Sequence, residues 1–199
     1  MQEEYSLLKP PHVPVINIRG VNGSGKSYLV RSWMKLLGAK PYPQRSNLFG
    51  GETATGAEYY LLSDDGRVIG DYRTNCGGCD RIHSQDEVAD HIRLGISSGS
   101  RYVLFEGVIL STVFEYWHQF SQSINGMLWV YLDTPLEVCL KRVSERNKNK
   151  AFKENLVRDK FRQVASTRRR AEAAGEKVFE IHWENAEKEL ENLIAGLNI

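Results

Sequence analysis

The chain has 199 residues, of which 41% are hydrophobic and 26% are charged, and its formal net charge is +1 at pH 7. These values exclude a predominantly disordered chain and are typical of one soluble α/β domain spanning residues 1–199. The first four residues include two glutamates, and no apolar run approaches membrane-spanning length. We therefore expect a cytoplasmic protein with no membrane partner.

The first predicted elements surround a phosphate-binding sequence. Residues 20–27 read Gly-Val-Asn-Gly-Ser-Gly-Lys-Ser and fit the Walker A pattern Gly-x4-Gly-Lys-Ser/Thr. A β-branched strand, Val15 to Ile18, precedes this loop, and a stretch with helical spacing, Tyr28 to Leu37, follows it. Because this order places the loop at a helix N-terminus, the sequence predicts a site for the phosphates of ATP or GTP.

The residues of this loop have distinct expected roles. Glycines let successive backbone N–H groups face the phosphates, Lys26 reaches the outer phosphates, and the Ser27 hydroxyl takes a place on Mg²⁺. The predicted nucleotide contacts are the loop residues and the residue after them, namely Gly20, Asn22, Gly23, Ser24, Gly25, Lys26, Ser27 and Tyr28.

A long loop over residues 39–57 is expected to lead into a hairpin. Its strands, Tyr59 to Leu62 and Arg67 to Tyr72, flank an Asp-Gly turn. Asp71 at the end of this hairpin and Asp80 beyond it are candidates for the base that accepts the proton of an acceptor hydroxyl. Turn capping is an equally good interpretation of either aspartate.

Cys76 and Cys79 have the spacing of a zinc or dithiol site, and His83 is a candidate third ligand. The alternative is a glycine-rich substrate loop with incidental thiols. With Cys139, the chain has three cysteines, too few and too unevenly placed for a disulfide framework, so we expect reduced thiols.

Further elements alternate between helix and strand. Ser84 with Glu87 predicts the start of a helix, and Tyr102 to Gly107 predicts a buried strand that ends in Glu106. We expect Glu106 to hold Mg²⁺ and take part in catalysis, the alternative being a salt bridge at the edge of the core. The aromatic residues 113–120 either stack on a base or pack a helix onto the sheet.

Two more strands, residues 127–133 and 177–182, each precede a predicted helix. Alternating strands and helices indicate a mainly parallel sheet flanked by helices, with the site at the carboxyl ends of the strands.

The charge is distributed unevenly along the chain. Residues 141–170 contain twelve Lys or Arg and three acidic residues, whereas the remaining chain has fourteen basic and twenty-two acidic residues. This segment indicates contact with nucleotide phosphates or with a nucleic-acid backbone, solvated helix charge being the alternative. Arg158, Arg162 and Arg169 are the candidate backbone contacts.

Together, Gly20 to Ser27, the strand ending in Phe105-Glu106-Gly107 and the run Tyr131 to Val143 resemble the P-loop nucleoside and nucleotide kinases. The resemblance implies a three-layer α/β sandwich and a mobile lid at about residues 147–154. It also implies that Arg142 and Arg146 act as catalytic lid arginines, which neutralise charge on the transferring phosphoryl group and accelerate transfer by about 10³ to 10⁵ when fully engaged.

More narrowly, Asp71, the segment Cys76 to Asp80 and the Glu106 strand resemble small bacteriophage kinases that include the 5-hydroxymethyluridine DNA kinases. The resemblance implies ATP and Mg²⁺ as cofactors, DNA as the acceptor and the host cytoplasm as the location. A free nucleoside or nucleoside monophosphate is the alternative acceptor, and a non-kinase P-loop NTPase is the alternative class. The sequence leaves a homodimer open.

Overall fold

The computed structural model describes residues 13–42, 59–74, 77–148, 150 and 152–197. The strands are β1 (Val15–Arg19), β2 (Lys40–Pro41), β3 (Tyr59–Leu61), β4 (Arg67–Ile69), β5 (Val103–Glu106), β6 (Leu128–Asp133) and β7 (Lys177–His182). The helices are α1 (Lys26–Leu36), the 3-10 turn η1 (Cys79–Arg81), α2 (Gln85–Ser97), α3 (Val108–Thr112), α4 (Glu115–Ser123), α5 (Leu136–Arg146), α6 (Glu154–Ala173) and α7 (Ala186–Ala195).

The strands form one sheet in the order β2-β3-β4-β5-β1-β6-β7. The β4–β5, β5–β1, β1–β6 and β6–β7 pairs are parallel, and the β2–β3 and β3–β4 pairs are antiparallel. This confirms the predicted mainly parallel sheet. The antiparallel β3–β4 pair is the predicted Asp-Gly hairpin, and within it Asp65 adopts a left-handed φ of 63°.

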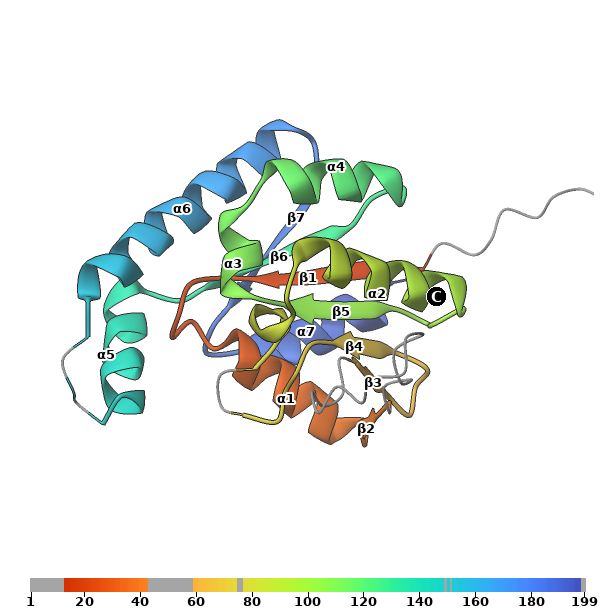
Figure 1. Ribbon diagram of the computed structural model, residues 1–199, viewed down its shortest axis with the longest axis horizontal. Helices are drawn as coiled ribbons and strands as arrows, with labels where there is room; N and C mark the ends of the chain where they lie inside the picture. The colour runs from red at the N-terminus through yellow and green to blue at the C-terminus, as the bar shows by residue number, and fades with distance from the viewer. Residues whose placement is uncertain (1–12, 43–58, 75–76, 149, 151, 198–199) are drawn as a thin grey trace, which may run out of the picture.

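Helices cover both faces of the sheet (Figure 1), which gives the predicted three layers. On one face, α1 and α7 pack against apolar residues of the central strands through Leu29, Trp33 and Leu190. On the other face, α2, α4 and α6 bury Ile92, Trp117 and Ala171. Alternating side chains of the buried strands supply both cores, as expected for a parallel sheet covered on two sides.

Local signals located several elements well. The Ser84 side chain accepts a hydrogen bond from the Glu87 N–H at 3.1 Å and caps α2 as predicted. Within residues 113–120, Trp117 and Phe120 lie in the core, which supports packing as their role. The structure describes residues 39–42 of the long loop expected over residues 39–57, and there the expectation is wrong, because Lys40–Pro41 form the short strand β2, which pairs with β3. The remainder of that loop lies outside the described residues, as do residues 149 and 151 of the lid expected at about residues 147–154, so these parts stay predictions. None of the described helices has the length and apolar character needed to span a membrane.

The parallel strands bring distant segments to one edge of the sheet. In register, Ile18 of β1 is paired with Glu106 of β5, and Ile69 of β4 with Phe105. The loop after β1, the carboxylate at the end of β5 and the segment after β4 therefore meet at the carboxyl ends of the strands, where α/β proteins bind their ligands.

Candidate active site

The phosphate-binding loop joins β1 to α1 through backbone conformations that favour glycine. Gly23 and Gly25 have φ angles of 82° and 103°, and Gly25 is the N-cap of α1. A Cβ atom on Gly23 would lie 2.4 Å from the carbonyl oxygen of Cys139 at the start of α5. Gly23 is therefore required by its backbone angle and by this close approach. The loop leads directly into a helix N-terminus, where backbone N–H groups bind anions.

Two long-range hydrogen bonds hold the loop in place. The Gly20 N–H donates to the Ser111 Oγ at 3.1 Å, and the Thr134 hydroxyl donates to the Ser24 carbonyl oxygen at 2.8 Å. Within the described residues, the buried Ser24 Oγ and Asn22 Oδ1 atoms have no hydrogen-bond partner. Buried polar atoms are normally satisfied, so a loop with two unsatisfied ones fits a polar ligand such as a phosphate chain.

Lys26, Ser27 and Glu106 converge beside the loop. The Ser27 hydroxyl donates to Glu106 Oε1 at 2.7 Å, although the two residues are 79 positions apart. Lys26 Nζ donates to the Val21 carbonyl oxygen at 3.2 Å and interacts electrostatically with Glu106. Burial lowers the pKa of Lys26, and the Glu106 carboxylate opposes that shift. The ammonium group therefore lies within the phosphate loop, partly balanced by one buried carboxylate.

Glu106 is almost completely buried, with 1% of its surface exposed. Burial raises the pKa of Glu106 to about 7, and the charge of Lys26 and the hydrogen bond from Ser27 both oppose the rise. A hydroxyl and a carboxylate are the hard oxygen donors that Mg²⁺ prefers, and a magnesium ion would relieve the cost of ionising this buried group. The two predicted metal residues therefore fit Mg²⁺.

Asp71 lies two residues after the end of β4, the strand that neighbours β5 on the side opposite to β1. Its backbone pairs with Gly78 through two hydrogen bonds of 3.2 and 2.9 Å. Gly78 packs closely against the Glu106 carboxylate, because a Cβ atom on Gly78 would lie 2.2 Å from Glu106 Oε1. The Asp71 carboxylate itself binds Arg73 and Arg81.

Asp80 is also engaged in a structural contact. Its two carboxylate oxygens accept hydrogen bonds from the Val108 and Ile109 N–H groups, at 2.8 and 2.9 Å. Asp80 therefore caps the start of α3, which begins two residues after Glu106. This arrangement favours the capping interpretation over the base, although Asp80 still contributes negative charge near Glu106 and Lys26.

Of the two thiols in this region, the structure describes only that of Cys79. Cys79 is buried, and its thiol donates to the Ile69 carbonyl oxygen at 3.5 Å. Among the residues that the structure describes, no group of three or more His, Cys, Asp or Glu side chains has the geometry of a metal site. Cys76 lies outside the described residues, so the pairing of the two cysteines stays a hypothesis.

The two predicted arginines of α5 differ in position. The Arg142 guanidinium donates to the Gly23 and Ser24 carbonyl oxygens at 3.4 Å and stacks over the Trp183 ring at 4.7 Å. Arg146 is exposed one turn further along, and within the described chain it makes no hydrogen bond to the loop. Only Arg142 is therefore placed at the phosphate loop.

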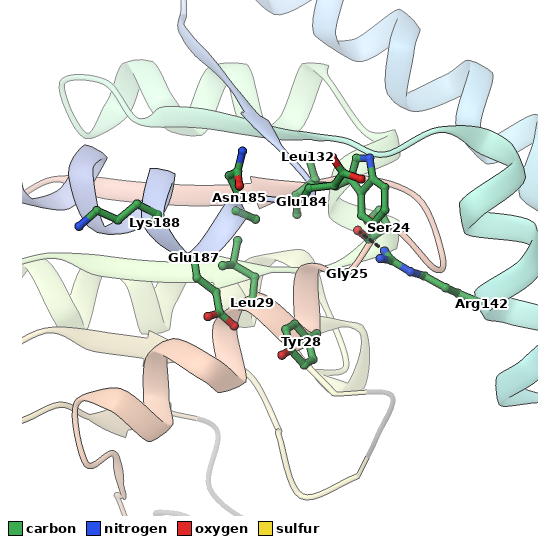
Figure 2. A pocket seen from close by; sticks show the side chains of 12 residues that line it. Ser24, Gly25, Tyr28, Leu29, Leu132, Arg142, Glu184, Asn185, Glu187 and Lys188 are labelled. Carbon is green, nitrogen blue, oxygen red and sulfur yellow. Dashed lines mark hydrogen bonds between the residues drawn. The ribbon is translucent and has the colours of Figure 1, made fainter.

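A cavity of about 850 Å³ opens beside the loop, between α1 and the turn that joins β7 to α7 (Figure 2). Tyr28, Arg142 and Trp183 line it together with the loop residues Ser24 and Gly25. Trp183 is the residue that sequence reasoning missed. The available signal was its place directly after the last strand, at the same carboxyl edge of the sheet as the phosphate loop.

The basic segment is partly balanced by neighbouring acids. Arg158 pairs with Glu154 and Glu137, and Arg162 pairs with Asp159. These exposed pairs contribute little stability and leave the side chains accessible. In contrast, Lys160 on the same helix interacts with Lys26, and it adds a small contribution to the lowering of the Lys26 pKa that burial mainly causes. Helix α6 therefore brings positive charge near the loop through Lys160, a residue that the sequence analysis did not single out.

This fold and site define a P-loop kinase. In agreement with that class, the fold is similar to a crystal structure of a gluconokinase from Sinorhizobium meliloti 1021, with a TM-score of 0.54 and 14% identity over 94% of each chain. A family model described as 5-hmdU DNA kinase matches residues 5–179. The chain belongs to the 5-hmdU DNA kinase family.

Curated relatives agree with this assignment. The 5-hmdU DNA kinase of Pseudomonas phage M6 is 41% identical over 188 residues, which cover 92% of this chain and 98% of the relative. The 5-hmdU DNA kinase of Pseudomonas phage PaMx11 is 32% identical over 189 residues, which cover 90% and 96%. Membership in this family confirms the prediction of a kinase and excludes the non-kinase NTPase.

Proposed function

We propose that this protein transfers the γ-phosphoryl group of ATP to the hydroxymethyl group of 5-hydroxymethyluracil bases in DNA. The observation that carries this proposal is the meeting of Lys26, Ser27 and Glu106 at the phosphate loop of a chain that belongs to the 5-hmdU DNA kinase family. In the reaction, the acceptor oxygen bonds to the γ-phosphorus, the bond to the β-phosphate bridging oxygen breaks, ADP leaves, and the hydroxyl releases its proton.

The loop and its neighbours act mainly by positioning and charge stabilisation, as phosphoryl transfer requires. Lys26 and the loop N–H groups bind the outer phosphates, while the cavity lined by Tyr28 and Trp183 accepts the nucleoside. Ser27 and Glu106 would hold Mg²⁺, and the bound ion would neutralise charge on the phosphates. Arg142 stabilises charge that develops during transfer, with Arg146 as a second, weaker contributor. Asp71 and Asp80, whose carboxylates bind arginines and a helix terminus, position the acceptor side.

The proposal is tested with γ-labelled ATP and matched DNA duplexes that contain 5-hydroxymethyluracil, thymine or 5-hydroxymethylcytosine at one position. We expect label only in the hydroxymethyluracil duplex, and none when EDTA removes Mg²⁺. The free nucleoside and its monophosphate serve as competing acceptors. Faster phosphorylation of the free monophosphate than of the duplex would replace the DNA-kinase proposal with a nucleotide kinase.

Arg142 offers a separate prediction. Replacing Arg142 with Lys is expected to lower kcat more than it raises the KM for ATP, because lysine cannot reproduce the guanidinium fork on developing charge. Arg146→Lys is the matched variant, and its effect should be smaller because Arg146 does not contact the loop. Steady-state kinetics with varied ATP measure both parameters. A change in KM alone would assign Arg142 to ground-state binding, in keeping with its stacking on Trp183.

A further inference from the structure

Asp71 binds two arginines on the acceptor side of the phosphate loop. Its Oδ1 atom accepts hydrogen bonds from the Arg73 N–H and Nε, both at 3.0 Å, and its Oδ2 atom accepts from Arg73 Nη2 at 2.8 Å and Arg81 Nε at 2.9 Å. The carboxylate is 9% exposed, whereas the Arg73 and Arg81 side chains are 44% and 45% exposed. A buried anion therefore orients two cations that face solvent.

The backbone around this cluster packs against the Glu106 carboxylate. The Asp71–Gly78 pairing closes the segment, and Gly78 packs directly on Glu106. Immediately before Arg81, the Asp80 carboxylate accepts the first N–H groups of α3. Both arginines therefore belong to a segment that packs against Glu106 at the carboxyl end of β5, the same edge of the sheet at which the phosphate loop lies.

The cluster has charge and hydrogen-bonding capacity left for an anion. Two guanidinium groups face one carboxylate, which leaves one net positive charge. The bonds to Asp71 use Nε and Nη2 of Arg73 but only Nε of Arg81. Arg31 adds a third guanidinium nearby, since it contacts the Thr74 carbonyl oxygen and lies over the Tyr72 ring. Arginine forks of this kind match the geometry of phosphate oxygens.

We propose that Arg73 and Arg81 bind a phosphate of the acceptor strand next to the nucleotide that is phosphorylated, and that Asp71 is a positioning residue that holds them. This inference rests on the proposed function, because it assigns the backbone contact of the same acceptor. Hydrogen bonds from Arg73, followed by those from Arg81, keep the pKa of Asp71 well below its usual range despite burial. A carboxylate so strongly stabilised in its ionised form is a poor proton acceptor, which argues against Asp71 as the general base.

Steady-state kinetics of Arg73→Gln, Arg81→Gln and Asp71→Asn separate these roles. Each arginine variant should raise the KM for a hydroxymethyluracil duplex about tenfold, the effect of losing one charge-assisted hydrogen bond, with kcat and the KM for ATP nearly unchanged. Asp71→Asn should also act on KM. If Asp71 were the general base, kcat would instead fall by about 10² to 10⁴, and the positioning role would be wrong.

The control variant is Arg101→Gln. Arg101 is 39% exposed and pairs with Asp64, so it matches the cluster in charge and accessibility, but it precedes the amino end of β5. Its KM for DNA should stay at the wild-type value. Because the ion pair between Asp71 and its arginines also orders the segment, thermal unfolding of every variant is measured alongside the kinetics.

Duplexes with single neutral methylphosphonate linkages identify the phosphate. For the wild type, we expect a raised KM at one linkage flanking the hydroxymethyluracil. In Arg73→Gln or Arg81→Gln, the neutral linkage at that position should raise the KM little further, because the substitution and the neutral linkage remove the same interaction. Additive effects at every linkage would overturn the proposed contact even if the arginine variants alone have raised KM values.

The outcomes also distinguish this inference from the proposed function. If the wild type phosphorylates the duplex while both arginine variants keep the wild-type KM, the arginine site is wrong and the DNA-kinase proposal stands. If only the free monophosphate is phosphorylated and its KM depends on Arg73 and Arg81, the phosphate is that of the nucleotide, and the contact with a DNA strand is wrong. If none of these acceptors is phosphorylated, the proposed function is wrong, and the arginine contact that rests on it is wrong as well.

Discussion

Replacing Lys26 with Ala should strongly impair phosphoryl transfer, with kcat/KM falling by about 10³-fold, as expected when a preorganised charge at the transferring group is lost. Lys26 is 4% exposed and lies inside the loop, where its ammonium group donates to the Val21 carbonyl oxygen and interacts with Glu106. No other described residue occupies the same place in the loop, so substitution leaves the outer phosphates without this contact.

The fold should survive the change, because the Lys26 ammonium group is desolvated at some cost and does not belong to the apolar core. Turnover and circular dichroism should be measured on the same preparation. Lys177→Ala, at the amino end of β7, removes an equal charge far from the loop and should leave turnover unchanged. Wild-type turnover in Lys26→Ala would refute the nucleotide-binding role of the loop. If the circular dichroism spectrum shows that Lys26→Ala is unfolded, the measurement is repeated with Lys26→Met, which removes the charge but keeps most of the side-chain volume.

Glu106→Gln should lower kcat by about 10²-fold or more and weaken the dependence on Mg²⁺, because the amide keeps the shape but loses the charge opposite the metal. A magnesium titration of turnover is the direct measurement. Asp90→Asn, an exposed carboxylate paired with Arg93 on α2, is the control. An unchanged magnesium titration in Glu106→Gln would remove Glu106 from the metal site.

The same variant should be more stable than the wild type when metal is absent. Burial raises the pKa of Glu106 from 4.5 to about 7, so the folded state holds a proton that the unfolded state releases between these pH values. Below pH 4.5 both states are protonated and the ionisation penalty vanishes. As the pH rises, wild-type stability falls relative to Glu106→Gln, and the difference levels off above pH 7 at no more than on the order of 3 kcal/mol.

Denaturant unfolding in EDTA at a series of pH values measures this difference. The gain should be absent at pH 4 and largest at pH 8. If Glu106→Gln were equally stable at all pH values, or less stable at pH 8, the buried carboxylate would not carry an ionisation cost. A stability gain together with lost activity would mean that the wild type tolerates a destabilising charge at its catalytic centre, as functional sites commonly do.

Much of the architecture follows from local sequence patterns. The loop at residues 20–27 is one contiguous segment, so its glycines, Lys26 and Ser27 identify a phosphate site without knowledge of distant contacts. The Ser84 cap and the Asp-Gly hairpin are equally local, because each depends on hydrogen bonds or backbone angles within a few residues. Alternation of strands and helices was enough for the parallel sheet.

Roles that depend on a partner far away in the chain were decided by tertiary structure. The sequence left Asp71 and Asp80 equivalent as candidate bases, yet one binds two arginines and the other caps α3. Arg142 and Arg146 shared the same helical spacing, and only the packing of α5 against the loop separates them. Trp183 gained its place in the cavity because β7 lies beside β6.

The sequence by itself therefore determined the kind of fold, the phosphate loop and the candidate carboxylate Glu106. Only the tertiary structure decided that Ser27 and Glu106 meet, that Gly78 packs on that carboxylate and that Asp71 is occupied by arginines. The physical reason is the order of strands in the sheet. Placing β5 between β4 and β1 brings three separate segments to one edge, and hydrophobic periodicity specifies which residues face the core but not which strands become neighbours.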